Sequence, residues 1–164
     1  MTTAAPTENP FLAFIAEFGD DWVKLVREVL GADPDEEQEK VLRAVQRGER
    51  RISIRSGHGV GKTTVLAWCV ICHILTRFPQ KTVATAPTGG QLFDALAAEV
   101  KSWINKLTPA MQSLLEVKSE SIHLAAAPHE SFISFKTSRA ETPEALAGIH
   151  SEHVLLIADE ASGV

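Results

Sequence analysis

The chain has 164 residues, a net charge of −5 and no apolar run near the roughly 20 residues that span a bilayer. Apolar residues make up 45% and charged residues 23%, which excludes a collagen-like, low-complexity or wholly disordered chain and is typical of a globular domain. The N-terminus lacks the basic and apolar regions of a signal peptide, and two cysteines do not make a disulfide framework. We therefore expect a cytoplasmic protein with no membrane segment.

The negative charge belongs to the N-terminal part of the chain. Residues 1–40 hold ten acids and three bases, whereas residues 41–164 hold eleven acids and thirteen bases. The larger part is thus slightly basic, and the net charge does not exclude a protein that handles nucleic acid.

Helices are expected first along the chain. Apolar residues recur at helical spacing from Phe11 to Leu30, and Gly19-Asp20-Asp21 is expected to divide them into two helices. Asp33-Pro34 is typical of an N-cap followed by a first-turn proline, which predicts a helix from there to about Gln46.

Strands and helices alternate in the rest of the chain. Strands are expected at residues 51–55, 81–86, 117–124, 131–137 and 154–158, with the third and fourth forming a hairpin. Helices are expected at residues 62–78, 91–107 and 109–116. The alternation predicts an α/β fold with a mainly parallel sheet, in which 154–158 is a buried strand. Such sheets bind ligands beyond the carboxyl ends of their strands, here after Arg55 and after Ala158.

A glycine-rich loop follows the first of these strands. Its sequence, Ser56-Gly57-His58-Gly59-Val60-Gly61-Lys62-Thr63-Thr64, matches a Walker A motif except that Ser56 replaces the first glycine. Glycines let backbone N–H groups approach phosphate oxygens, and the following helix directs its positive end at the anion. We expect Lys62 to reach the β- and γ-phosphates of ATP and the Thr63 hydroxyl to ligate Mg²⁺. Arg55 would contact phosphate or simply end its strand, and the alternative for the whole loop is a turn with an incidental lysine.

Two acids follow the apolar run at residues 154–158. Asp159 is expected to help hold Mg²⁺, and Glu160 to position the water that attacks the γ-phosphate. The alternative is a solvated strand end.

These motifs, with residues 83–91 and 146–150, resemble the ATPase domain of phage terminase large subunits over about residues 30–164. The resemblance implies a RecA-like P-loop NTPase at residues 33–164, incomplete at its C-terminus, after an N-terminal helical segment at residues 1–32. It implies ATP and Mg²⁺ as cofactors and a motor that drives viral DNA into capsids. The implied partners are double-stranded DNA, the terminase small subunit, the capsid portal and further copies of the chain in a ring.

The resemblance also implies roles for two residues outside the loop. Gln38 matches a glutamine that recognises adenine, although Glu37 stands where the family often has tryptophan. Arg139 is the candidate for an arginine finger that acts on a neighbouring copy. The alternatives are an exposed helical glutamine and an ordinary surface arginine.

Two other functions fit the same motifs. The first is the leading RecA-like domain of a DExx-type helicase, because Asp159-Glu160-Ala161-Ser162 suits that family too. The second is a non-catalytic fragment that only binds nucleotide or protein. Uncovered core surface would make the fold marginal or prone to association.

Overall fold

The computed structural model describes residues 9–55, 61–138 and 148–159. Its helices are α1 (Pro10–Phe18), α2 (Trp22–Glu28), α3 (Glu36–Gln46), α4 (Lys62–Thr76), the π-helix η1 (Gly90–Ala97), α5 (Ala98–Ile104) and α6 (Pro109–Gln112). Its strands are β1 (Gln80–Thr85), β2 (Leu115–Val117), β3 (Ser121–Leu124), β4 (Ser131–Phe135) and β5 (His153–Ala158). Within the described residues, no helix has the length and apolar character needed to cross a membrane.

The strands form one five-stranded sheet in the order β2-β3-β4-β1-β5. Strand β1 lies between β4 and β5 and is parallel to both, so Val83 is paired with Ser134 on one side and Leu156 on the other. Strand β3 pairs antiparallel with β4, which confirms the predicted hairpin. The single strand predicted at residues 117–124 is wrong, because the chain reverses after Val117 and β2 pairs antiparallel with β3. The predicted α/β class is therefore confirmed, with a mixed sheet whose parallel part is β4-β1-β5.

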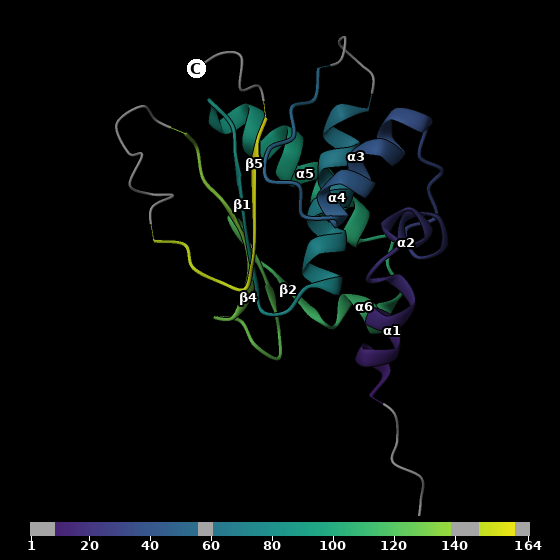
Figure 1. Ribbon diagram of the computed structural model, residues 1–164. Helices are drawn as coiled ribbons and strands as arrows, with labels where there is room; N and C mark the ends of the chain where they lie inside the picture. Colours follow the sequence, from purple (N-terminus) through teal and green to yellow (C-terminus); the bar gives the residue numbers. More distant parts are fainter. Residues whose placement is uncertain (1–8, 56–60, 139–147, 160–164) are drawn as a thin grey trace, which may run out of the picture.

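Helix α4 occupies the centre of the core, and Figure 1 shows α1 to α4 gathered on one side of the sheet. The helix is apolar on most faces, and its residues from Ala67 to Thr76 are all buried. Trp22 of α2 is fully buried and donates its indole N–H to the Thr76 hydroxyl at 3.1 Å. Cys69 and Cys72 are buried, as predicted, and burial raises the pKa of the Cys69 thiol to about 12. They serve as core residues.

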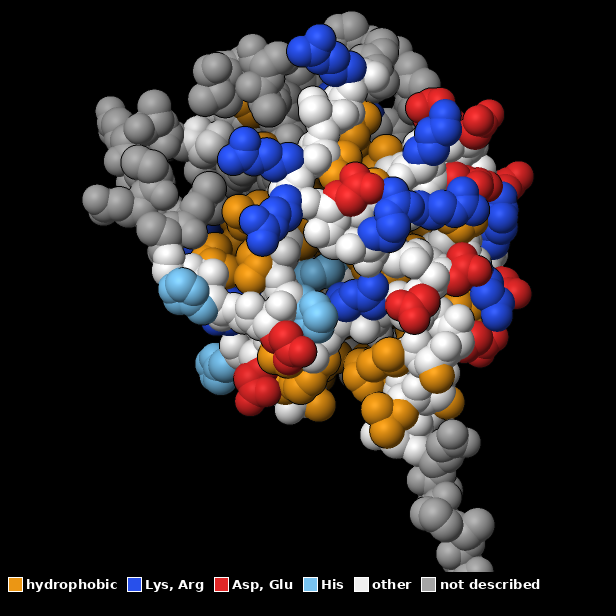
Figure 2. Space-filling model, in the orientation of Figure 1, with side chains coloured by type: hydrophobic (Ala, Val, Ile, Leu, Met, Phe, Trp, Pro, Cys, Tyr) orange, Lys and Arg blue, Asp and Glu red, His pale blue; other side chains and the backbone are white. Residues whose placement is uncertain are grey.

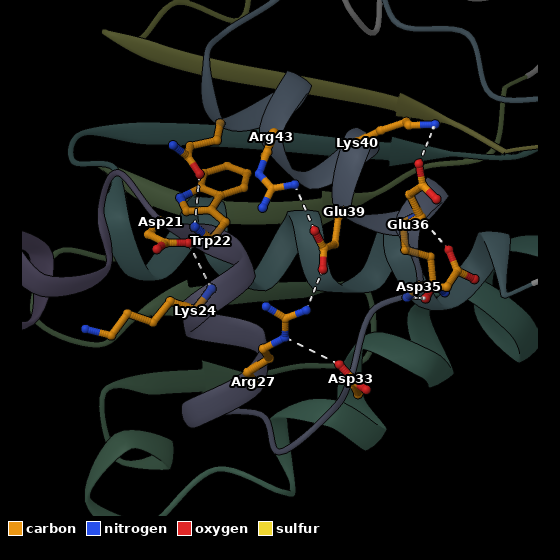
Figure 3. A network of polar contacts seen from close by, with 12 residues as sticks. Asp21, Trp22, Lys24, Arg27, Asp33, Asp35, Glu36, Glu39, Lys40 and Arg43 are labelled. Atoms are coloured by element: carbon orange, nitrogen blue, oxygen red, sulfur yellow. Dashed lines mark hydrogen bonds and ion pairs between the residues drawn. The ribbon is translucent and has the colours of Figure 1, made fainter.

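A polar network ties α2 to α3 (Figure 3). Arg27 lies between two acids, contacting Asp33 at 3.4 Å and Glu39 at closer range. Glu39 also accepts from Arg43, one turn further along α3, at 2.8 Å. Because Glu39 is only 20% exposed, this network holds α3 at a defined position against the N-terminal helices.

Asp35, not Asp33, caps helix α3, so the predicted cap is wrong by two residues. The Asp35 carboxylate accepts from the Gln38 N–H at 2.8 Å, and the Gln38 side chain accepts from the Asp35 N–H at 3.0 Å. This is a capping box, which satisfies two donors at the helix start at once. Asp33 turns to Arg27 instead, and Pro34 precedes the cap rather than opening the helix. The predicted end near Gln46 is confirmed.

Residues 51–55 do not form the predicted strand. No backbone hydrogen bond between described residues involves them, and Ile52 is 38% exposed. An extended segment becomes a strand only when a neighbour pairs with it. Strand β5 pairs with β1 and with no other described strand, so the expectation that residues 154–158 are fully buried is also wrong. Val154 and Leu156 on β5 are 42% and 55% exposed.

The predicted helix over residues 91–107 is present in two parts. It begins as the π-helix η1 and continues as α5 to Ile104. The predicted helix at 109–116 ends at Gln112, because the alternating apolar residues Leu115 and Val117 pair with β3 instead. The division between residues 1–32 and 33–164 stays a prediction; Trp22 and Leu25 share one core with α4.

Candidate nucleotide-binding site

Helix α4 begins at Lys62, and its N-cap residue, Gly61, has the positive backbone angle φ of +66°. This backbone conformation favours glycine, and a Cβ atom here would lie 2.7 Å from Nε2 of Gln38, whose flexible side chain would have to move. The first described intrahelical bond runs from the Val65 N–H to the Gly61 carbonyl at 3.0 Å. Backbone N–H groups at the start of an α-helix point along its axis without a carbonyl of the helix to accept from them, which makes such a turn suited to an anion.

Lys62 and Asp159 meet at the carboxyl end of β5. Lys62 Nζ lies 3.6 Å from Oδ1 of Asp159, and their side chains are 28% and 6% exposed. The Asp159 N–H donates to the Thr85 carbonyl at 2.9 Å, which extends the β1–β5 pairing by one residue and fixes the start of the acidic pair. The structure thus brings together a lysine and an acid from distant parts of the chain at the predicted place.

Gln38 reaches the same loop from α3. Its Nε2 donates to the Gly61 carbonyl at 3.2 Å, while its Oε1 accepts from Asp35. The side chain therefore joins the start of α3 to the start of α4. Both ends of the carboxamide bond to backbone, and the expected contact with adenine stays a prediction.

Thr63 is half-buried, and Thr64 beside it makes a contact that the motif does not predict. The Thr64 hydroxyl donates to Oε1 of Glu99 on α5 at 3.0 Å, and the same oxygen accepts from the Trp103 indole at 2.9 Å. Sequence reasoning missed Glu99, because a lone glutamate in a helix belongs to no nucleotide-binding motif. Its spacing from Trp103, four residues, was the only available signal.

A groove of about 1820 Å³ extends from Lys62 along the free edge of β5. It is lined by residues of α4 and of β5 and by residues 46–50 and 52–55. The α4 residues in this lining include Lys62, Leu66, Cys69 and His73, and Arg77 follows the helix. The groove exceeds the roughly 300–1,000 Å³ of a small-molecule pocket, so a nucleotide at Lys62 would fill only one end.

The charged side chains that line the groove are of both signs, and the basic ones outnumber the acidic ones. Arg47, Arg50, Arg55, Lys62 and Arg77 line it, with Glu49, Glu152 and Asp159 as the acids. Figure 2 shows Lys and Arg side chains spread over this face with apolar side chains exposed between them. Arg55 is exposed and borders the groove at the end nearest the loop.

Several predicted site residues lie outside the described residues. They are Ser56, Gly57, His58, Gly59, Val60, Arg139 and Glu160. Their expected roles stay predictions. Among the described candidates, the structure groups Gln38, Gly61, Lys62 and Asp159 at one end of the groove.

The chain was compared with known proteins. No family model matches it. It is 26% identical over 167 aligned positions to a protein of Enterobacteria phage P7 named "Probable terminase, large subunit". That match covers the whole chain and 34% of the relative, so the chain spans about a third of the length of the curated relative it matches. The resemblance that the motifs predict is confirmed: this chain is related to a phage terminase large subunit.

Proposed function

We propose that the chain is the ATP-binding and ATP-hydrolysing part of a viral terminase large subunit, with a RecA-like P-loop fold. The observation that carries the proposal is the pairing of Lys62 with the buried Asp159 at the N-terminus of α4 and the carboxyl end of β5. A lysine, a helix N-terminus and a strand-end acid are the groups that phosphoryl transfer from a nucleotide requires. The relation to a terminase large subunit supports the same function.

The described residues fit ATP with Mg²⁺. Lys62 supplies a cation for the phosphates, and the backbone N–H groups at the start of α4 supply further donors. Thr63 and Asp159 supply the hydroxyl and carboxylate oxygens that Mg²⁺ prefers. Bound Mg²⁺ would neutralise charge that develops on the phosphates. Glu160 would hold the attacking water, and Arg139 of a neighbouring copy would stabilise the γ-phosphate.

In the proposed setting, ATP hydrolysis moves double-stranded DNA into a capsid. The partners are then DNA, the small subunit, the portal and other copies in a ring, in the cytoplasm of the bacterial host. The slightly basic character of residues 41–164 and the arginines along the groove support contact with an anionic polymer.

Calorimetric titration with ATP and Mg²⁺ tests the site. Lys62→Ala is expected to weaken binding at least tenfold, because the ammonium that would face the phosphates is lost. Lys118→Ala, which removes an exposed lysine elsewhere, is the matched control and should bind as the wild type does. Unchanged ATP affinity in Lys62→Ala would overturn the site.

Turnover separates the catalytic function from a fragment that only binds nucleotide. A Mg²⁺-dependent ATPase rate that Glu160→Ala abolishes, with ATP affinity retained, is the expected result. Nucleotide binding without turnover would leave the non-catalytic alternative standing. The phage relative favours the terminase function over the helicase alternative.

A further inference from the structure

We propose that Glu99 is a positioning residue that fixes the first turn of α4, and with it Lys62 and Thr63, against α5. Its effect on nucleotide binding rests on the function proposed above. Its effect on the conformation of α4 does not depend on that function. No motif in the sequence assigns Glu99 a role.

Glu99 joins two helices through a single carboxylate oxygen. It lies in the first turn of α5 and is half-buried. Its Oε1 accepts from the Thr64 hydroxyl at 3.0 Å and from the Trp103 indole N–H at 2.9 Å. Trp103 lies one turn further along the same helix, and its hydrogen bond orients the Glu99 carboxylate. The carboxylate is thereby held in position to accept from Thr64.

A second contact, one turn away, keeps the two helices in register. The Trp103 ring packs edge-on against Trp68 of α4, with centroids 5.5 Å apart. Thr64 and Trp68 are four residues apart on α4, as Glu99 and Trp103 are on α5. Helices α4 and α5 therefore contact each other at two points one turn apart, through a hydrogen bond at the first and an aromatic contact at the second.

The hydrogen bond between Thr64 and Glu99 lies in the first turn of α4, beside the residues of the proposed site. Thr64 directly follows Lys62 and Thr63, so the first α4 turn cannot rotate or unwind without breaking its bond to Glu99. A threonine hydroxyl in a helix otherwise bonds back to the preceding turn, where it competes with the helix's own pattern. Phosphate-binding groups lose activity steeply when displaced by about 1 Å, so an anchor one residue away has functional consequences.

The experiment measures hydrogen exchange of the backbone amides of residues 65–67 without nucleotide, and ATP affinity separately. Glu99→Ala should speed exchange about tenfold and weaken ATP binding by a similar factor, because a hydrogen bond to a charged acceptor is lost. Glu99→Gln keeps an acceptor at the same place and should stay close to the wild type in both. Asp94→Ala, which removes an exposed carboxylate on η1, is the matched control and should change neither.

Thr64→Val provides a second route to the same bond and leaves the Glu99–Trp103 contact intact. It should speed exchange as Glu99→Ala does, and the double variant should add little. Additive effects, or Glu99→Ala exchange equal to that of the wild type, would overturn the positioning role. So would a Glu99→Gln variant that behaves like Glu99→Ala. If the wild type binds no ATP while Glu99→Ala still loosens residues 65–67, the proposed function fails and the positioning role stands.

Discussion

Lowering the pH should destabilise the protein through one buried histidine. His73 of α4 is 6% exposed, and its Nδ1 lies 2.8 Å from the Gln80 amide oxygen and 3.0 Å from the Thr82 hydroxyl. Burial lowers the pKa of His73 to about 4. The hydrogen bond with Gln80 opposes this shift in pKa, and electrostatic interactions with His153 and Arg77 add to it.

The sign and the size of the effect follow from the two pKa values of His73. The unfolded chain holds His73 at its ordinary pKa of 6.5, so between that value and about 4 the unfolded state binds the extra proton and the folded state does not. The free energy of unfolding therefore falls as the pH drops through this window. The difference between the pKa of 6.5 in the unfolded chain and that of about 4 in the folded chain corresponds to roughly 3 kcal/mol of unfolding free energy.

Urea unfolding at several pH values between 4.5 and 7.5 measures this loss. The matched variant is His73→Gln, which keeps a hydrogen-bonding side chain but cannot titrate. Carboxylates that titrate near pH 4 affect both proteins, so the difference between their slopes isolates His73. Equal slopes for wild type and variant would refute the assignment of a neutral, buried His73.

Two further predictions concern the free edge of the sheet and the start of α3. Leu156→Lys places a charge on the exposed edge strand β5 and should reduce self-association, because edge lysines block strand pairing between molecules. Sedimentation velocity measures this, and a wild type that is monomeric at all concentrations would contradict the prediction. Asp35→Ala should lower the free energy of unfolding by about 1 kcal/mol through loss of the cap. Asp33→Ala, which removes only an exposed contact with Arg27, should cost less than half as much. The reverse order would support the original cap assignment.

Local sequence signals predicted the elements that depend on local chemistry. The glycine and acids at residues 19–21 end one helix and cap the next, because Asp21 accepts from the Lys24 N–H at 3.0 Å. The apolar stretch of α4 and the run before Asp159 were both located correctly. The sequence predicts ligand-binding residues after Arg55 and after Ala158, and the structure brings Lys62 and Asp159, which follow these positions, to 3.6 Å, although residues 51–55 form no strand.

The predictions that the structure contradicts concern interactions between distant segments of the chain. Alternation at residues 51–55 predicts a strand, but alternation alone supplies no neighbour to pair with. The apolar composition of residues 154–158 predicts a buried strand. Whether that strand lies at the edge or in the centre of the sheet depends on which other strands pair with it. Glu99 was missed because its importance arises from Thr64, which lies 35 residues away on another helix. Tertiary contacts of this kind leave no local pattern.

The parts of the proposed site differ in how they are anchored. Asp159 is held by β5 and by its backbone bond to Thr85, and Lys62 by α4, whose first turn is fastened by Gln38 on one side and Glu99 on the other. Residues 51–55, by which the chain enters the loop, have no backbone hydrogen bond within the described chain. The geometry of the Lys62–Asp159 pair therefore rests on α4, α5 and the β1–β5 pairing, not on the segment that precedes the loop. If the proposed function holds, substitutions in α4 and α5 should accordingly disturb ATP binding more than substitutions of Ile52 or Ile54, even though the latter lie closer in sequence to the glycine-rich loop than Glu99 does.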